Sequence, residues 1–215
     1  MQNNSINIHT NEISGCSHED CITFVNNKNI ELVQMDCVDG KAKNGPTILT
    51  LSFVYSRLIL VFLLPEKSSE CVIQVLNQLE TIFGSELFSL IFGAILTDNS
   101  HEFKDLVGME RSINGGRRTR IFYCEYFHPS QKGLCENNNK LVRYVIPKGT
   151  NLNNYTQADM LKLTNNINSY IRKILNGHTA FEIAKETLPD EFFVKLGLEA
   201  VPPETIILKP KLLGK

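Results

Sequence analysis

The sequence contains no tryptophan and only six cysteines in 215 residues, and its formal net charge at pH 7 is −1. The cysteines stand singly, which excludes a scaffold held by disulfides and favours free thiols in a reducing compartment. Glycine and proline number 13 and 8, too few for a collagen-like or a wholly disordered chain. A hydrophobic content of 42% is that of an ordinary globular protein.

The sequence also lacks an uninterrupted apolar run that would span a membrane. Its most apolar stretch, residues 47–64, is broken by the Tyr-Ser-Arg sequence at 55–57. The unbroken part, residues 58–64, is far shorter than the roughly 20 residues that a span needs. Residues 1–10 are polar and do not resemble a secretory signal. We therefore expect a cytoplasmic protein with no membrane partner.

Hydrophobic periodicity and turn signals divide the chain into three parts. Residues 1–29 are polar and rich in asparagine, which predicts a poorly ordered leader or a loose partial helix. Residues 30–150 form the expected α/β domain, and residues 151–215 a helical C-terminal extension. The expected strands are 30–37, 47–54, 58–64, 95–97 and 120–124, and the expected helices are 68–83, 129–144, 157–175, 179–186 and 189–196. This order predicts a mixed five-stranded sheet with flanking helices.

Basic residues concentrate in one region of this nearly neutral chain. Residues 111–150 contain eight basic and two acidic side chains. Such an excess favours a polyanionic partner, and the alternative is a solvated basic loop.

Three acidic residues lie where strands and helices leave the centre of the predicted sheet. Asp36 ends the first strand, Asp98 follows the fourth, and Glu136 lies in the helix after the fifth. Because carboxylates at one point repel one another, such a cluster is stable mainly around divalent cations, and oxygen ligands favour Mg²⁺ or Mn²⁺. Two such ions would support phosphoryl transfer. The alternative is that these residues are ordinary turn and surface acids.

Three strings around these acids carry a family resemblance. They are VQMDCVDG at 33–40, ILTDNSHEF at 95–103 and HPSQKGLCENNNKLVRYVIPKGT at 128–150. Together with residues 167–183 and the C-terminal IILKPKLL, they make the chain resemble the insertion-sequence-30 family of bacterial transposases. That family belongs to the Asp-Asp-Glu, retroviral-integrase-like group, and the resemblance implies a ribonuclease-H-like catalytic core over residues 30–150.

The resemblance also implies roles for individual residues. Asp36, Asp98 and Glu136 match the metal-binding catalytic triad, which would hold two Mg²⁺ or Mn²⁺ ions. The implied reaction is cleavage at transposon ends and strand transfer into target DNA, by a homo-oligomer that associates with the nucleoid. The residues expected to contact the DNA backbone are Lys132, Lys140, Arg143, Lys148, Arg117, Arg118 and Arg120. The expected supporting residues are Asn99, Glu102 and Gln131. The alternative role is helix capping for Asn99 and Glu102, and loop solubility for Arg117, Arg118 and Arg120.

The chain departs from the family pattern in two places. Only 29 residues precede the first expected strand, so the helix-turn-helix region that recognises transposon ends is expected to be missing. Ser100 stands where the family has a glycine after Asp98-Asn99. The first departure leaves a second hypothesis, a truncated remnant that cannot transpose but folds and binds DNA or a full-length transposase. A ribonuclease-H-type nuclease is a third, although it would not share the strings after Glu136.

Overall fold

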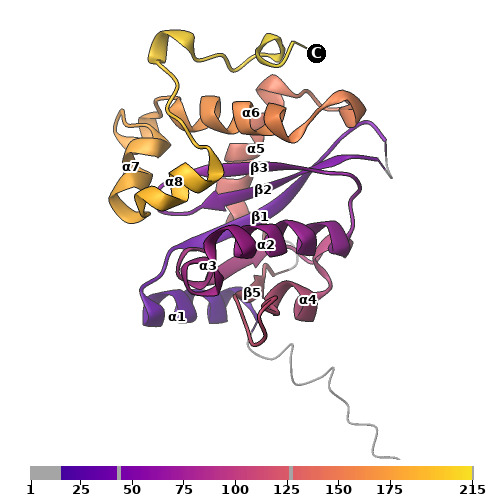
Figure 1. Cartoon of the computed structure of the whole chain (residues 1–215), viewed down its shortest axis with the longest axis vertical. Coiled ribbons are helices and arrows are strands. Elements are labelled where there is room, and N and C mark those ends of the chain that lie inside the picture. Colours follow the sequence, from indigo (N-terminus) through magenta and orange to yellow (C-terminus); the bar gives the residue numbers. More distant parts are fainter. Residues whose placement is uncertain (1–15, 43–44, 126–127, 215) are drawn as a thin grey trace, which may run out of the picture.

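The computed structural model describes residues 16–42, 45–125 and 128–214, and it contains one five-stranded sheet (Figure 1). The strands are β1 (Leu32–Asp39), β2 (Thr47–Phe53), β3 (Ile59–Leu64), β4 (Ala94–Thr97) and β5 (Arg120–Tyr123). Their order across the sheet is β3-β2-β1-β4-β5. β1, β2 and β3 pair in antiparallel fashion, whereas β4 is parallel to both β1 and β5. The sheet is therefore mixed, as the sequence predicts.

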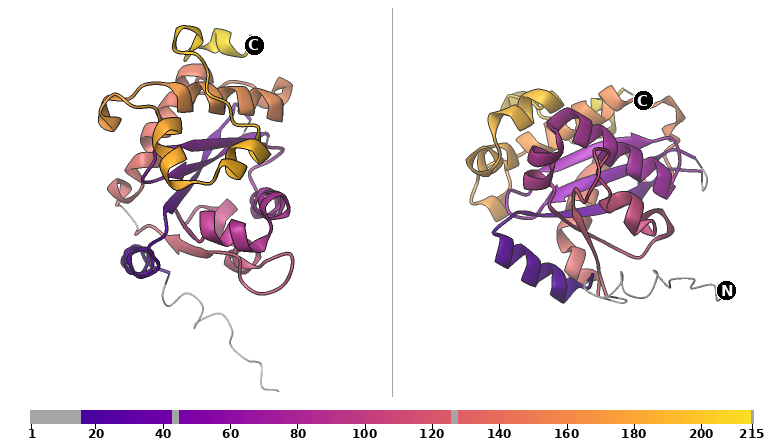
Figure 2. Two further views of the ribbon diagram at one scale, coloured as in Figure 1. Left: turned by 60° about the vertical axis from the view of Figure 1, so that its left-hand side comes forward. Right: turned by 60° about the horizontal axis from the view of Figure 1, so that its bottom comes forward.

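Helices cover both faces of this sheet. They are α1 (His18–Lys28), α2 (Ser69–Phe83), α3 (Ser85–Ile91), α4 (Leu106–Glu110), α5 (Gly133–Val145), α6 (Gln157–Ser169), α7 (Ala180–Thr187) and α8 (Asp190–Leu196). Figure 2 shows α2 and α3 on one face and α1 and α5 on the other. None of the helices in the described ranges is both long and apolar enough to cross a membrane.

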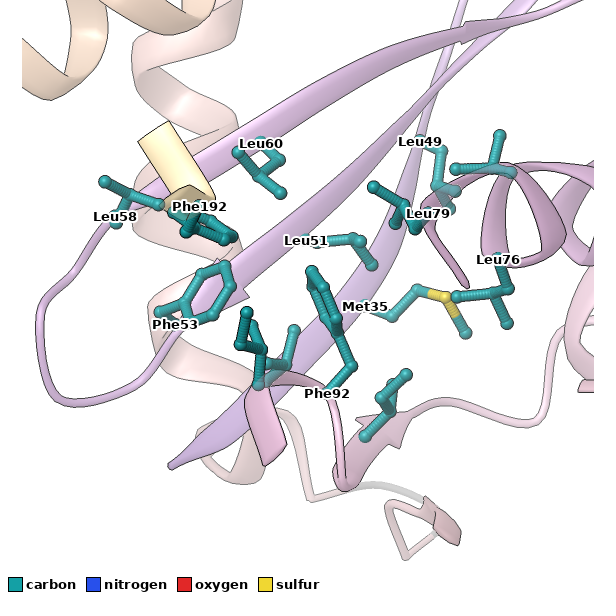
Figure 3. Close-up of a cluster of buried hydrophobic side chains, with 14 of the residues drawn as sticks. Met35, Leu49, Leu51, Phe53, Leu58, Leu60, Leu76, Leu79, Phe92 and Phe192 are labelled. Carbon is teal, nitrogen blue, oxygen red and sulfur yellow. The ribbon is translucent and has the colours of Figure 1, made fainter. Parts of the chain in front are cut away.

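The two faces of β1 differ in character because successive side chains of a strand point to opposite sides. Val33 and Met35 lie in the apolar cluster beneath α2, together with Leu49 and Leu51 of β2. Figure 3 shows this cluster, in which the ring of Phe192 from α8 lies beside the rings of Phe53 in β2 and Phe92 directly after α3. The intervening residues of β1 point to the α5 face, where Asp36 lies.

The C-terminal helices pack directly on the sheet. Phe192 of α8 packs with its ring centroid 5.7 Å from that of Phe53 in β2. Met160 and Leu163 of α6 belong to a second apolar cluster on the α5 face, together with Val142. Residues 151–214 thus complete the hydrophobic core of the sheet.

Helix α6 covers the open edge of the sheet with polar side chains. An edge strand presents unpaired N–H and C=O groups, which other chains can pair with. Here three backbone N–H groups of β3 donate to side chains of α6. Ile59 N donates to Asn168 Oδ1 at 2.9 Å and Val61 N to Thr164 Oγ1 at 3.2 Å. Leu63 N donates to Gln157 Oε1 at 3.0 Å. Asn168 Nδ2 also donates to the carbonyl oxygen of Ile59 at 2.8 Å. The edge is therefore closed within the chain.

Replacing Asn168 by Ala is expected to lower the free energy of unfolding by about 1–3 kcal/mol, because it leaves a buried N–H and a buried C=O of Ile59 without partners. Urea unfolding followed by circular dichroism measures the loss. Lys162→Ala, on the exposed side of α6, is the control and should change stability by less than about 0.5 kcal/mol. Equal effects of the two substitutions would contradict a role for Asn168 in closing the edge.

Three helices refine the picture from the sequence. Residues 18–28 of the predicted leader form α1, the helical alternative of that prediction. A capping box between Ser17 and Asp20 begins α1, and Phe24 packs on Phe122 of β5; residues 1–15 lie outside the described residues. Helix α3 precedes β4 in a stretch where the sequence analysis expects no helix. The long C-terminal helix ends at Ser169 instead of residue 175, which leaves Ile174 69% exposed.

Candidate active site

The register of two parallel strands brings two of the predicted catalytic acids side by side. Leu32, Val33 and Gln34 of β1 are in register with Ala94, Ile95 and Leu96 of β4. Continued by two residues, the same register sets Asp98 beside Asp36. Because the carboxyl ends of parallel strands meet at one end of a sheet, acids that are distant in sequence lie together here. Thr97 Oγ1 also donates to Met35 O at 3.1 Å, which ties the two strand ends.

The ammonium group of Lys132 joins the two aspartates. Nζ lies 2.9 Å from Asp36 Oδ1 and 3.0 Å from Asp98 Oδ2. The lysine side chain is only 9% exposed, whereas those of Asp36 and Asp98 are 21% and 40% exposed. Lys132 ends the single helical turn Pro129–Lys132 that precedes α5. The structure therefore places this residue inside the site, paired with both aspartates, and its predicted contact with the DNA backbone stays a prediction.

The charges at the site shift the affinities of both partners for protons. Burial alone would raise the pKa of Asp98, but the charge of Lys132 and the hydrogen bonds from Ser100 and Lys132 outweigh it and hold that pKa below its ordinary value. Burial opposes the charged form of Lys132, but the two carboxylates outweigh it and raise its pKa. Both shifts favour the ionised pair.

The stability that this pair contributes has a definite pH window. The lowered pKa of Asp98 gives a contribution that is present above its ordinary value of about 3.9 and lost as the pH falls through the folded-state value. The raised pKa of Lys132 gives one that is present below about 10.4 and lost as the pH rises through the folded-state value.

In metal-free buffer, the difference in unfolding free energy between wild type and Lys132→Met is therefore expected to be constant from about pH 5 to 9 and to shrink below about pH 4. Urea unfolding at a series of pH values measures it. Lys185→Met, an exposed lysine of α7, is the control and should show no such acid-dependent difference. A difference that changes steadily across the neutral range would contradict the assignment.

Asn139 of α5 orients the second oxygen of Asp36. Its Nδ2 donates to Asp36 Oδ2 at 2.7 Å, and its Oδ1 accepts from Thr50 Oγ1 at 3.1 Å. Thr50 is the cross-strand neighbour of Asp36 in β2. The two oxygens of Asp36 are thus held by different groups, an ammonium and an amide. The sequence analysis does not identify Asn139, although a run of three asparagines inside a predicted helix, where asparagine is unfavourable, is a signal for it.

Further polar contacts attach α5 to the sheet. Gln34 of β1 accepts from Cys135 N at 3.1 Å and donates to Gln131 O at 2.9 Å, so it fixes the start of the helix. One turn later, Asn138 Nδ2 donates to Ser52 Oγ at 3.0 Å. These bonds add to the apolar packing of Val142 and Val145 against the sheet, and they fix the position of α5 relative to Asp36.

Glu136, the third predicted acid, lies in the first turn of α5 and is exposed. In the described ranges, no three side chains of His, Cys, Asp or Glu converge into a group that could hold a metal ion. The structure thus brings Asp36 and Asp98 together without bringing Glu136 into the group. The physical reason is charge: one ammonium offsets two carboxylates only in part, so a third would be repelled. Glu136 nevertheless follows Lys132 by four residues, in the first turn of the helix that begins directly after that lysine.

Arg118 is a predicted DNA contact that the structure corrects. Its side chain is fully buried and pairs with Glu80 of α2 at 3.2 Å. It also donates to Asn77 Oδ1 and to the carbonyl oxygens of Met109 and Gly108. A guanidinium with these internal partners does not face DNA; it holds the loop before β5 against α2.

The other predicted DNA contacts lie on the surface or at its border. Lys140 and Lys148 are exposed, and Arg143 donates from Nη2 to Asp39 O at 2.9 Å. Arg117 is 58% exposed and pairs with Glu110 at 3.0 Å, whereas Arg120 is 30% exposed. These five positions keep their assignment to DNA as a prediction.

The three predicted supporting residues connect loops around the site. Asn99 Nδ2 donates to Cys124 O at 3.2 Å, linking the segments that follow β4 and β5. Gln131 Oε1 accepts from Glu125 N at 2.8 Å. Glu102 is buried and pairs at 3.3 Å with Lys67, which also binds Asp39 at 2.9 Å. All three thus make contacts that hold the surroundings of the aspartates in place.

The sequences of known proteins confirm the resemblance to insertion-sequence transposases. No family model matches the chain. The chain is 30% identical over 166 residues to the transposase InsI of insertion sequence element IS30C from Escherichia coli, covering 77% of this chain and 41% of that protein. It is also 30% identical over 148 residues to a putative integrase of a Spiroplasma virus, covering 69% of this chain and 44% of that protein. The chain therefore spans less than half the length of these curated relatives.

The fold is also found among solved structures. One chain from the structure of a simian T-cell lymphotropic virus intasome superposes with a TM-score of 0.54 and 16% identity, covering 82% of this chain and 58% of that chain. Such a low identity shows the fold alone. The mixed five-stranded sheet with its flanking helices is thus the ribonuclease-H-like fold of integrase catalytic cores, as the sequence strings imply.

Proposed function

We propose that this chain, which is similar over 166 residues to an insertion-sequence-30 transposase, is the catalytic domain of a transposase. In this proposal it cleaves DNA at transposon ends and transfers the freed strands into target DNA, with Mg²⁺ or Mn²⁺ as cofactor. It acts as an oligomer on DNA in the bacterial cytoplasm.

The convergence of Asp36 and Asp98 on one cation is the observation that carries this proposal. Two carboxylates that come from adjacent parallel strands contact a single Nζ at 2.9 and 3.0 Å. A carboxylate pair that holds a shared cation in this way has the hard oxygen donors that Mg²⁺ requires. The residues present therefore fit a divalent metal held by Asp36 and Asp98, with Glu136 as the further carboxylate on α5.

The metal, when bound, supplies Lewis-acid stabilisation of the charge that develops on the phosphate oxygens. The remaining work falls to the protein. Asn139 and Thr50 keep Asp36 in one orientation, and Gln34 fixes the start of the helix that carries Glu136. This support matters because catalytic groups need to be held within a fraction of an ångström of their working positions.

Exposed cations near the same helix supply the contacts to DNA in this proposal. Lys140 lies one turn after Glu136 on α5, and Lys148 follows the end of that helix. Both are exposed. Lysines at such positions neutralise backbone phosphates without reading the base sequence, so they position the DNA beside the carboxylates.

A cleavage and strand-transfer assay tests the proposed function. The full chain is incubated with labelled duplexes that carry transposon-end or pre-nicked sequences, in Mg²⁺ or Mn²⁺ and, as control, in EDTA. We expect nicked and joined products only in the presence of the divalent metal. DNA retention without cleavage in any metal would instead support the non-enzymatic remnant.

A further inference from the structure

Lys132 occupies the place between Asp36 and Asp98 where a divalent cation would need to bind. Its Nζ is at direct ion-pair distance from both carboxylates, 2.9 and 3.0 Å. A metal ion and the ammonium cannot both hold these two oxygens. We propose that Lys132 is an internal counter-ion that the divalent metal must displace, and that the displaced ammonium then pairs with a phosphate of the DNA. This inference rests on the proposed function and adds a control on metal binding.

The surroundings of Lys132 permit such a displacement. Asp98 is 40% exposed, so the pair can be reached from solvent on that side. Asp36 keeps its orientation when the lysine leaves, because Asn139 holds its other oxygen at 2.7 Å. The four-carbon stem of lysine moves its head group by rotations about single bonds, so no backbone change is needed.

The charge balance gives the direction of the exchange. One ammonium leaves two carboxylates with a net negative charge, whereas one divalent ion neutralises both. The ammonium in turn needs a new anion, and a DNA phosphate beside the site supplies it. Metal and DNA should therefore bind cooperatively through Lys132, each raising the affinity for the other by the same factor.

Amine labelling of the wild-type protein tests the displacement without any substitution. Lysines are acetylated briefly in metal-free buffer and in saturating Mg²⁺, and the modified positions are quantified by mass spectrometry. We expect the labelling of Lys132 to rise about tenfold in Mg²⁺, a change within the range of coupled equilibria. Lys140, already exposed on α5, is the internal control and should change little. Unchanged labelling of Lys132 while Mg²⁺ raises the melting temperature would overturn the proposal.

Metal affinity gives a second measurement, with Lys132→Met compared with wild type and with Lys185→Met as the matched control. Free Mn²⁺ is measured by electron paramagnetic resonance in the absence and presence of a double-stranded oligonucleotide, and circular dichroism verifies folding. Without DNA, we expect Lys132→Met to bind Mn²⁺ about tenfold more tightly than wild type and Lys185→Met. DNA should raise the affinity of wild type by a similar factor and that of Lys132→Met much less.

The possible results separate this inference from the proposed function. If Lys132→Met and wild type bind Mn²⁺ equally and the wild type cleaves DNA, the counter-ion proposal is overturned and the transposase proposal stands. If Lys132→Met binds Mn²⁺ more tightly but the wild type never cleaves DNA, the counter-ion proposal is supported and the proposed activity is contradicted. Absence of Mn²⁺ binding in all three proteins overturns both.

Discussion

Replacing Asp36 by Asn is expected to lower the rate of DNA strand cleavage about 1,000-fold, which is the upper range for removing one preorganised electrostatic group. The carboxylate loses its charge but keeps its size, so its contacts in β1 remain and the fold should be retained. The amide is a poor ligand for Mg²⁺ compared with a carboxylate, so metal binding and cleavage should fail together. Single-turnover cleavage of a labelled duplex, with circular dichroism as the folding control, measures the effect.

Glu136→Gln gives the sharper test of the same site, because Glu136 is exposed and lies outside the pair held by Lys132. If it acts as a catalytic carboxylate, its substitution should lower cleavage about as much as that of Asp36 while leaving stability within about 0.5 kcal/mol of wild type. Glu186→Gln, an exposed glutamate of α7, is the control and should cleave at the wild-type rate. Full activity of Glu136→Gln would remove this residue from the catalytic set.

Replacing Arg118 by Met is expected to lower the free energy of unfolding by about 3–5 kcal/mol, because it leaves a buried carboxylate without its counter-ion. Arg118 and Glu80 have no exposed side-chain surface. Burial opposes ionisation of Glu80, but hydrogen bonds from Ser112, Ser85 and Ile113 N, together with Arg118, hold its pKa below the ordinary value. The charge therefore remains when the arginine is removed. Urea unfolding at neutral pH measures the loss.

Two controls distinguish this buried pair from its exposed neighbour. Arg117→Met removes a 58%-exposed arginine that pairs with Glu110, and should cost less than about 1 kcal/mol. The double variant Glu80→Leu/Arg118→Met should be more stable than the sum of its two single variants predicts, by about 0.5–3 kcal/mol, since it leaves no unpaired charge. Equal effects of Arg117→Met and Arg118→Met would show that burial does not determine the role of Arg118.

These two arginines also show where prediction from sequence stops. Both lie in one basic run, and the sequence assigns both to DNA because it records charge without burial. Burial of Arg118 depends on Glu80 and Asn77 of α2, which precede it by 38 and 41 residues. The two aspartates that Lys132 binds are likewise 96 and 34 residues away from it in the sequence. Contacts over such separations are set by how the elements pack.

The sequence by itself determined the five strands and their order along the chain. Alternating and helical patterns of apolar residues depend on local periodicity, so all five strands and the helix that carries Glu136 could be placed from them. The strings around Asp36, Asp98 and Glu136 determined the resemblance, and with it the expected fold. The parallel register of β1 and β4 decided that Asp36 and Asp98 meet. Tertiary structure alone decided which cation lies between them and that Asn139 orients one of them, because electrostatic balance and burial arise only when distant segments are packed together.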